Sequence, residues 1–246
     1  MLDALVDLLL APVCLACDGL ITVGDATRLI CRRCRSRLRR PPDPCCPRCG
    51  APRLRTGATE GAACSFCADW PPAIRFARSA CLLHPPADRI VHQLKYGGWR
   101  ALSEPMADRM AGLDLPAELN DARLVVPVPT TRRRRRSRGY NQAELLARAY
   151  ARRLDRECST LLERTRGSDS QTALQPLERA ANVAGAFRVI ADDGFLTGKH
   201  ILLVDDVLTT GATSSECART LAASGARCVS IVTFARALDA RRLLGS

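Results

Sequence analysis

The pattern of apolar and polar residues predicts strands that alternate with helices over residues 71–246. Two short apolar runs, 124–128 and 201–204, are rich in β-branched residues, as expected of buried parallel strands. A polar turn and a helical pattern follow each run, over 141–154 in the first case and up to Gly225 in the second. This alternation predicts an α/β domain, with a mainly parallel sheet flanked by helices.

Three further segments belong to the expected organisation. The stretch DRIVHQLKYGGWR predicts a helix that ends at Gly97 and Gly98, and AFRVI, from Ala186, predicts a strand. The long polar segment that begins at Glu163 has no clear periodicity at first and is expected to be a mobile loop. The proline-rich stretch DWPPAIRF places a domain boundary between residues 1–70 and 71–246.

The first third of the chain is poor in core residues and rich in cysteine. Nine of the 13 cysteines fall between residues 14 and 67, and eight of them form four C-x-x-C pairs. Two thiolates spaced in this way can share one metal ion, and a second pair completes a tetrahedral four-sulfur site. The pattern therefore predicts two structural Zn²⁺ sites, with the ligands Cys14, Cys17, Cys31, Cys34, Cys46, Cys49, Cys64 and Cys67.

The spacing leaves the pairing of these cysteines open. Joining consecutive pairs is simplest, and joining the first pair to the third is the alternative. A redox role for one pair is disfavoured, because a thioredoxin-like site needs only one pair. Cys45 is expected to be the spare thiol, and the C-x-x-H spacing of Cys81 and His84 is interpreted as part of the core. The isolated cysteines are expected to be buried: Cys158, Cys217 and Cys228.

The first apolar stretch, residues 1–13, is too short to span a membrane, and it carries two aspartates in place of a basic leader. Four leucines fall on one helical face and predict a short packing helix: Leu2, Leu5, Leu8 and Leu9. We therefore expect a cytoplasmic protein without a membrane span. In that compartment the cysteines would stay reduced, which favours metal binding over disulfides.

Charge adds one expectation about partners. The chain carries a net charge of +12 at pH 7, and Lys95 and Lys199 are its only lysines among 37 basic residues. A cationic protein favours anionic partners such as phosphates or nucleic acid.

The most specific candidate chemistry lies between residues 201 and 226. Asp205 and Asp206 follow the expected strand, and carboxylates at this position can accept hydrogen bonds from ribose hydroxyls or approach a phosphate-bound Mg²⁺. A small, hydroxyl-rich turn comes next and offers backbone N–H groups and a helix N-terminus to a phosphate. The turn consists of Thr209, Thr210, Gly211, Ala212 and Thr213.

Two other interpretations of this segment are weaker. One is a buried strand with a solvated acidic turn. The other is an ATPase Walker B strand, which would need a Walker A motif elsewhere. The nearest candidate, GFLTGKH from Gly194, has one residue too few between its glycines and has His200 where Ser or Thr is required.

Five arginines, 132–136, follow the strand expected at 124–128. Such runs are usually solvated loops. This run lies beyond the carboxyl end of a strand, where open α/β sheets bind ligands, so Arg132 or its neighbours are candidates to bind a pyrophosphate. The remaining arginines are expected to face solvent or a nucleic-acid backbone.

These motifs carry a resemblance to known families. ILLVDDVLTTGAT has every element of the ribose-phosphate loop of type I phosphoribosyltransferases, the enzymes that use phosphoribosyl pyrophosphate (PRPP). Nearly the whole chain resembles the ComF family of competence-associated proteins. Besides this loop, the matching features are the paired cysteines, LKYGG, VPVPTTRRRRRSRGYNQAELLA and RTRGSDSQTALQPLERAANVAGAF. The resemblance implies a double zinc ribbon followed by a type I phosphoribosyltransferase-like domain.

The resemblance also implies roles for individual residues. Asp205 and Asp206 would hold the ribose hydroxyls, with Mg²⁺ bound mainly through the pyrophosphate, and residues 209–213 would cradle the 5′-phosphate. The place of the pyrophosphate loop would be taken by Thr130, Thr131 and Arg132. A flexible lid would include Arg164, Gln171, Arg179 and Asn182, of which the two arginines would join the aspartates in catalysis. Lys95 and Arg138 match family motifs without an assigned role.

Two functions are compatible with these features. The first is a phosphoribosyltransferase, a glycosyltransferase that binds PRPP and acts in competence-related DNA uptake or nucleotide salvage. Such chemistry needs charge stabilisation and orientation more than a strong base, so the lack of an obvious catalytic His or Cys is no objection. The second is a non-catalytic nucleic-acid-binding module of the DNA uptake machinery, which would bind single-stranded DNA beside a helicase-like competence protein. An aromatic content of only 4% weighs against base stacking in that second function.

Overall fold

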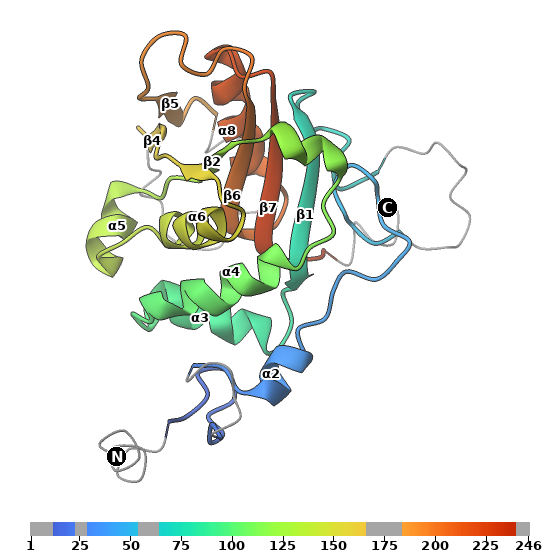
Figure 1. Ribbon diagram of the computed structural model, residues 1–246, viewed down its shortest axis with the longest axis vertical. Helices are drawn as coiled ribbons and strands as arrows, with labels where there is room; N and C mark the ends of the chain where they lie inside the picture. The colour runs from blue at the N-terminus through green and yellow to red at the C-terminus, as the bar shows by residue number, and fades with distance from the viewer. Residues whose placement is uncertain (1–11, 23–28, 54–63, 166–183, 240–246) are drawn as a thin grey trace.

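The computed structural model describes residues 12–22, 29–53, 64–165 and 184–239. A five-stranded sheet lies at the centre of this part of the chain, in the order β1-β7-β6-β2-β3, and all of its pairings are parallel (Figure 1). Its strands are β1 (Ile74–Leu82), β2 (Leu124–Pro127), β3 (Glu157–Cys158), β6 (His200–Leu208) and β7 (Cys228–Arg236). The expected α/β fold with a mainly parallel sheet is confirmed.

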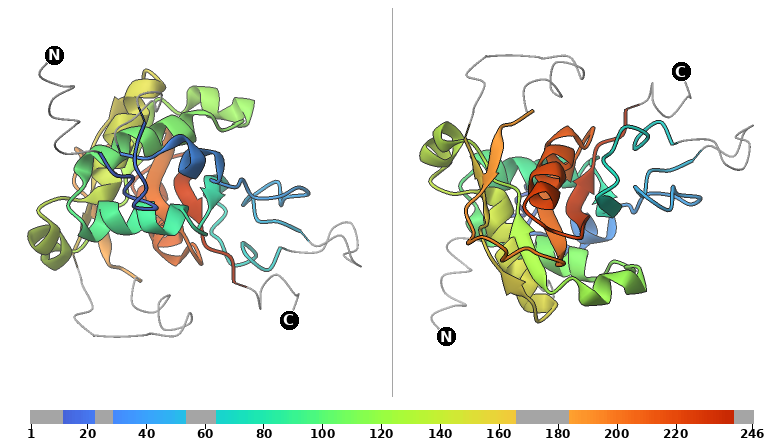
Figure 2. Two further views of the ribbon diagram at one scale, coloured as in Figure 1. Left: turned by 90° about the horizontal axis from the view of Figure 1, so that it is seen from below. Right: turned by 90° about the horizontal axis from the view of Figure 1, so that it is seen from above.

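Helices cover both faces of the sheet (Figure 2). The buried apolar residues of α3 and α4, and those of α6 except Ala143, belong to one core cluster, whereas those of α8 belong to a second cluster. The helices are α2 (Arg32–Ser36), α3 (Ala87–Tyr96), α4 (Ser103–Ala111), α5 (Arg132–Arg138), α6 (Gln142–Arg153) and α8 (Ala212–Ala223), with 3-10 turns η1 (Arg100–Leu102) and η2 (Ala117–Asp121). No described helix is long and apolar enough to cross a membrane.

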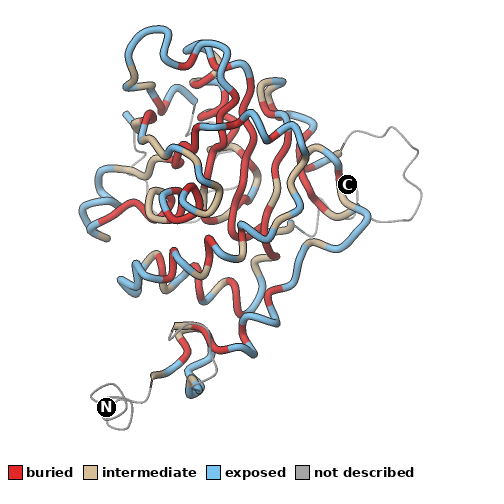
Figure 3. The backbone as a smooth tube through the Cα atoms, viewed as in Figure 1, coloured by how far each residue is buried: buried red, intermediate tan, exposed pale blue. Residues whose placement is uncertain are grey.

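Strand β6 explains why the sequence has a continuous apolar run at its centre. Leu202 and Val204 pack into the cluster that contains α6, and Ile201 and Leu203 pack into the cluster that contains α8. Successive side chains of a strand point to opposite faces, so a strand covered on both sides must be apolar throughout. Figure 3 shows the resulting band of buried residues along the sheet.

A small antiparallel sheet stands beside α8, and it joins β4 (Leu162–Arg164) to β5 (Phe187–Val189). The strand predicted from AFRVI is therefore present over its central residues. Residues 166–183, which hold most of the predicted lid, lie outside the described residues, as does the predicted N-terminal helix.

Two elements differ from the sequence-based expectation. The arginine run was expected to be a loop, but it forms helix α5, because the Thr131 side chain accepts a hydrogen bond from the Arg134 backbone N–H and Gly139 ends the helix in a left-handed conformation. Strand β6 continues past Val204 to Leu208, so Asp205 and Asp206 lie inside the strand and not after it.

The cysteine-rich part of the chain contacts the sheet domain in two places. The first four cysteines lie near α2, on the side of α3 and α4 that faces away from the sheet (Figure 1), and the Arg109 guanidinium donates to the carbonyl of Leu38 at 2.8 Å. The next four lie beside the edge strand β1, where the Ala77 N–H donates to the carbonyl of Arg48 at 2.7 Å. The second group thus packs against the edge of the sheet.

Candidate functional site

Two aspartates near the carboxyl end of β6 form the centre of the candidate site. Asp206 is 3% exposed, and its Oδ2 atom lies 2.7 Å from the Lys95 Nζ atom, which reaches across from the last turn of α3. The Asp205 Oδ1 atom accepts a hydrogen bond from the Asp206 backbone N–H at 2.8 Å. The sequence had singled out Lys95 without a role, and the structure places it as the cation opposite Asp206.

Burial raises the pKa of the Asp205 carboxyl well above its ordinary value, and the charge of Asp206 raises it further, although Lys95 acts in the opposite direction. A carboxyl in this state ionises readily only when more positive charge arrives. A cation brought in with a ligand, or the hydroxyls of a sugar, would provide the missing partners.

The turn after β6 has the conformation expected of a phosphate-binding loop. Gly211 adopts a positive φ of 82° and is the first residue of the turn into α8, where no side chain caps the helix. The Ala212 N–H donates to the Thr210 hydroxyl at 3.3 Å. The remaining N–H groups at the start of a 12-residue helix, together with its dipole, suit an anion.

The opposite wall of the site carries positive charge. Thr130 follows β2, which is the neighbour of β6 in the sheet, so the loops after the two strands meet. Arg134 of α5 and Arg164 of β4 both face the same cavity. Burial and the like charge of Arg134 lower the pKa of Arg164, and a bound anion would relieve that repulsion.

These groups line one cavity with a volume of about 470 Å³. Of the predicted site residues, its wall includes Asp205, Asp206, Thr209, Thr213, Thr130 and Arg164. Sequence analysis assigned no role to several other residues of the wall: Asp88, His92, Tyr96 and Gln142. Tyr96 and Gln142 lie inside the quoted motifs LKYGG and VPVPTTRRRRRSRGYNQAELLA, whereas Asp88 and His92 of α3 belong to no motif.

The remaining predicted residues have other surroundings. Thr131 caps α5, and Arg132 is 77% exposed and pairs with Glu163 at 2.7 Å. The Arg138 guanidinium donates to the Gln142 side chain at 2.8 Å and stacks on the Tyr96 ring. The predicted lid residues Gln171, Arg179 and Asn182 lie outside the described residues. The roles assigned to all these residues stay predictions.

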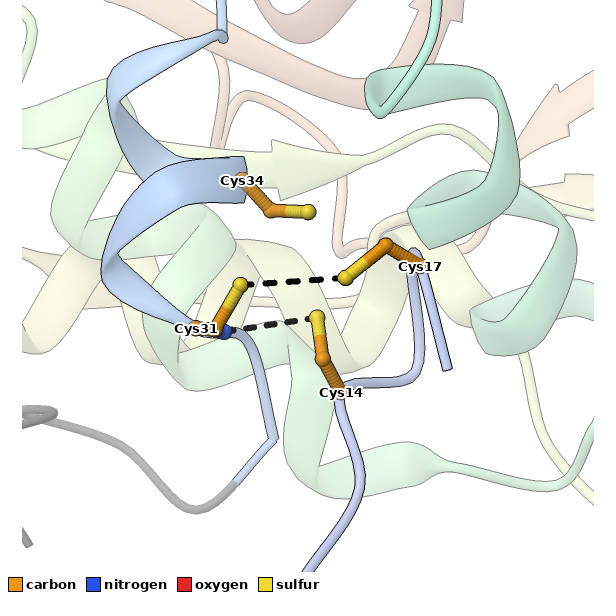
Figure 4. A group of neighbouring side chains, drawn as sticks. All are labelled: Cys14, Cys17, Cys31 and Cys34. Atoms are coloured by element: carbon orange, nitrogen blue, oxygen red, sulfur yellow. Dashed lines mark hydrogen bonds between the residues drawn. The ribbon is translucent and has the colours of Figure 1, made fainter. Parts of the chain in front are cut away.

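The eight paired cysteines form two clusters, and each cluster joins consecutive pairs. Within each cluster the four sulfur atoms lie within 4.8 Å of one another. Figure 4 shows the sulfur atoms of Cys14, Cys17, Cys31 and Cys34 turned toward a common centre. We call this group the first cluster, and Cys46, Cys49, Cys64 and Cys67 the second cluster.

The sulfur positions fit Zn²⁺. The distance is 3.8 Å between Cys17 and Cys31, 3.8 Å between Cys46 and Cys67, and 3.7 Å between Cys49 and Cys64. Four ligands placed tetrahedrally at a Zn–S distance of about 2.3 Å would be about 3.8 Å apart. With all four positions taken by sulfur, each site is closed and suits a structural metal ion.

The other cysteines fall largely where the sequence analysis expected them. Cys45 stays out of the second cluster, and its thiol donates to the Pro42 carbonyl at 3.2 Å. Cys81, Cys217 and Cys228 are buried, and burial raises the pKa of Cys81 to about 12. Cys158 is only half-buried, because it lies on the short edge strand β3. His84 is exposed, so the core interpretation was correct for Cys81 and wrong for His84.

Comparison with known families agrees with this architecture. A family model described as a double zinc ribbon domain matches residues 5–71, and a phosphoribosyl transferase domain model matches residues 141–243. The DNA utilization protein YhgH of Escherichia coli K12 is 31% identical over 220 residues, which cover 85% of this chain and 91% of that protein. Competence protein ComFC of Bacillus subtilis is 27% identical over 239 residues, which cover 90% and 93% of the two chains.

Solved structures of phosphoribosyltransferase folds also match. A glutamine PRPP amidotransferase from B. subtilis aligns with 58% of this chain and 26% of its own, with 18% identity and a TM-score of 0.35. A hypoxanthine phosphoribosyltransferase from Staphylococcus aureus aligns with 61% of this chain and 68% of its own, with 16% identity and a TM-score of 0.32. We draw nothing about substrates from similarities of this size.

Proposed function

This chain belongs to the ComF family, and from that premise we propose that it binds PRPP in the cavity between β2, β6 and α3 and acts as a phosphoribosyltransferase. One observation carries the proposal: a single cavity combines the carboxyl groups of Asp205 and Asp206, the first and last residues of the turn that opens α8 (Thr209 and Thr213), and the guanidinium groups of Arg134 and Arg164. PRPP has a ribose, a 5′-phosphate and a pyrophosphate. The aspartates suit the ribose hydroxyls, the start of α8 suits the 5′-phosphate, and the arginines suit the pyrophosphate.

In the proposed reaction, a nitrogen atom of the acceptor forms a bond to the anomeric carbon of the ribose. The bond from that carbon to the pyrophosphate oxygen breaks, and the pyrophosphate leaves with the electron pair. Asp205 and Asp206 would orient the ring through its hydroxyls, and the arginines would stabilise charge on the leaving group. Mg²⁺, bound mainly through the pyrophosphate, would neutralise part of that charge. The proton lost by the acceptor would pass to solvent.

Calorimetric titration of PRPP into the zinc-loaded protein with Mg²⁺ tests this proposal. We expect the Asp205→Asn and Asp206→Asn double variant to bind at least about a hundredfold more weakly, because hydrogen bonds to charged groups contribute about 1.5–3 kcal/mol each. The matched control is Asp192→Asn with Asp193→Asn, an adjacent pair of exposed aspartates that makes the same charge change away from the cavity. Equal affinity of the wild type and the first variant would contradict the proposal.

A second candidate function is binding of single-stranded nucleic acid, and a different observation supports it. Six of the seven residues of α5 are arginine, and none of the seven is buried. Tyr96 and Trp99, at and just beyond the end of α3, are 66% and 45% exposed, and Arg138 of α5 lies over the Tyr96 ring. A low aromatic content thus still leaves one exposed ring against a cationic helix and a second exposed ring three residues further along the chain. Rings and arginines together bind stacked bases and phosphates.

The two functions are compatible, since α5 contributes Arg134 to the cavity wall, whereas Arg133, Arg135 and Arg136 are exposed and do not line the cavity. E. coli YhgH is named for DNA utilization and B. subtilis ComFC for competence. By analogy, we place the proposed activity in DNA uptake or in salvage of its products, in the cytoplasm, with a helicase-like competence protein as a proposed partner.

A further inference from the structure

A tryptophan joins the second cysteine cluster to the turn that opens α8. Trp70 follows Cys67 closely, its backbone N–H donates to the Cys67 carbonyl at 3.2 Å, and its side chain is 7% exposed. The indole Nε1 donates to the Thr210 carbonyl at 3.4 Å, although Thr210 lies 140 residues further along the chain. The last turn of the zinc-binding segment therefore contacts the expected phosphate loop directly.

Gly211 shows how close this contact is. A Cβ atom built on Gly211 would lie 2.6 to 2.7 Å from three atoms of the Trp70 ring. Gly211 also has a φ of 82°, a conformation that residues with a side chain rarely adopt. The indole thus packs on the bare face of the glycine and restrains the peptide whose conformation sets the start of α8.

The position of Trp70 depends in turn on the second cluster. Arg48 stands between Cys46 and Cys49, and its guanidinium donates to the carbonyls of Cys67 at 3.0 Å, Trp70 at 3.2 Å and Pro71 at 2.9 Å. One cysteine pair therefore holds the backbone that carries the other pair and the tryptophan. Any change in the distance between the two pairs would be transmitted to Trp70.

A buried cation ties the same cluster to the sheet. Arg236 ends β7 opposite Leu208, is 1% exposed, and donates to the Cys49 carbonyl at 2.7 Å. Its guanidinium also lies 3.7 Å from the Cys49 sulfur. A buried guanidinium needs a compensating negative charge, and the Cys49 sulfur, as a thiolate bound to Zn²⁺, would supply it at this distance.

We infer that Trp70 is a positioning residue, which makes the conformation of the Thr209–Thr213 loop depend on metal occupancy of the second cluster. With Zn²⁺ bound, four thiolates would hold Arg48, Arg236 and Trp70 in place. Without it, nothing would fix the distance between the two cysteine pairs, and the indole would lose its fixed support. The effect on the loop conformation does not depend on the proposed function, whereas an effect on PRPP affinity rests on it. Coupling between two binding sites is reciprocal, so bound PRPP would also strengthen the retention of the metal ion.

The test compares Cys67→Ser, which removes a ligand of the second cluster, with Cys17→Ser, which removes an exposed ligand of the first cluster. Both are made in a Trp99→Phe background, so that Trp70 is the only tryptophan of the chain. Three readouts are taken: Trp70 emission, amide hydrogen exchange of residues 205–216, and the Kd for PRPP.

For Cys67→Ser we expect a red-shifted emission, loop exchange at least about tenfold faster, and PRPP binding weaker by about tenfold. For Cys17→Ser we expect all three readouts to stay near those of the parent protein. If emission and loop exchange do not respond to Cys67→Ser, the inference is wrong. If the parent protein does not bind PRPP, the proposed function fails, while emission and exchange still decide the role of Trp70.

A second pair of variants covers the case in which Cys67→Ser does not fold. Trp70→Leu keeps both cysteine clusters, so two zinc ions per chain should be retained while loop exchange accelerates. Trp70→Phe restores an aromatic ring without the N–H donor and should recover most of the protection, because ring packing on Gly211 is the main contact. Wild-type exchange in Trp70→Leu would overturn the inference.

Discussion

Lys95, Asp205 and Asp206 form the charge centre of the molecule at the scale of single residues. Two adjacent carboxyl groups would repel each other in a buried site, and one ammonium group at 2.7 Å from Asp206 compensates only one of them. The repulsion that is not compensated acts on Asp205. Burial and the charge of Asp206 raise the pKa of its carboxyl well above the ordinary value. Positive charge or hydrogen-bond donors brought by a ligand would therefore stabilise the ionised form of Asp205.

This raised pKa predicts a specific dependence of stability on pH. A carboxyl whose pKa is higher in the folded state than in the unfolded state, where it is about 3.9, stabilises the fold below that lower value and loses this contribution as pH rises through the folded-state pKa. Asp205→Asn should therefore stabilise the ligand-free protein at pH 7–8, by about 1–3 kcal/mol. Urea unfolding at several pH values measures the gain, which should shrink toward pH 4.

Asp114→Asn serves as the control, because Asp114 is exposed. A gain for Asp205→Asn that stays constant between pH 4 and pH 8 would show that the carboxyl is not strained by its surroundings.

At the scale of elements, the sequence was most informative where periodicity and end signals agree. Helix α6 was expected over 141–154 and covers Gln142–Arg153, with the Asn141 side chain accepting from the Ala143 N–H. Helix α5 was missed because five adjacent like charges suggested a solvated loop. Its end signals, Thr131 and Gly139, were present, and arginine itself has a high helix propensity.

Helix α5 is the element on which the nucleic-acid function can be tested. Replacing Arg133, Arg135 and Arg136 with glutamine leaves the cavity wall unchanged and removes three positive charges. Each lost phosphate contact should lower the slope of log affinity against log salt by about 0.7, so a decrease of about 2 is expected for single-stranded DNA. Fluorescence anisotropy with a labelled oligonucleotide at several salt concentrations measures the slope.

The matched control changes three exposed arginines at α2 and its C-terminal end: Arg33, Arg35 and Arg37. These substitutions remove the same charge from another part of the surface. If the α2 variant loses the salt dependence and the α5 variant keeps it, DNA binding belongs to the zinc-binding segment and not to α5.

At the scale of the whole molecule, the sequence identified both parts of the chain but not how they cooperate. The four C-x-x-C pairs predicted two metal sites. In the structure each site is formed by two consecutive pairs, a choice that the spacing alone had left open. The contact of Trp70 with Gly211 has no sequence signal, since it joins residues 141 positions apart through packing alone. The domain boundary near residue 70 stays a proposal, and Trp70 shows that the two parts touch close to it.

³¹P NMR of PRPP with Mg²⁺ shows whether one cavity binds both the 5′-phosphate and the pyrophosphate, because the spectrum resolves these two groups. We expect both sets of resonances to shift or broaden when the zinc-loaded protein is added, as the 5′-phosphate meets the start of α8 and the pyrophosphate meets the turn at Thr130 and Arg134. A response of the pyrophosphate alone would indicate nonspecific attraction to arginines. That result, or no response at all, would contradict the proposed site.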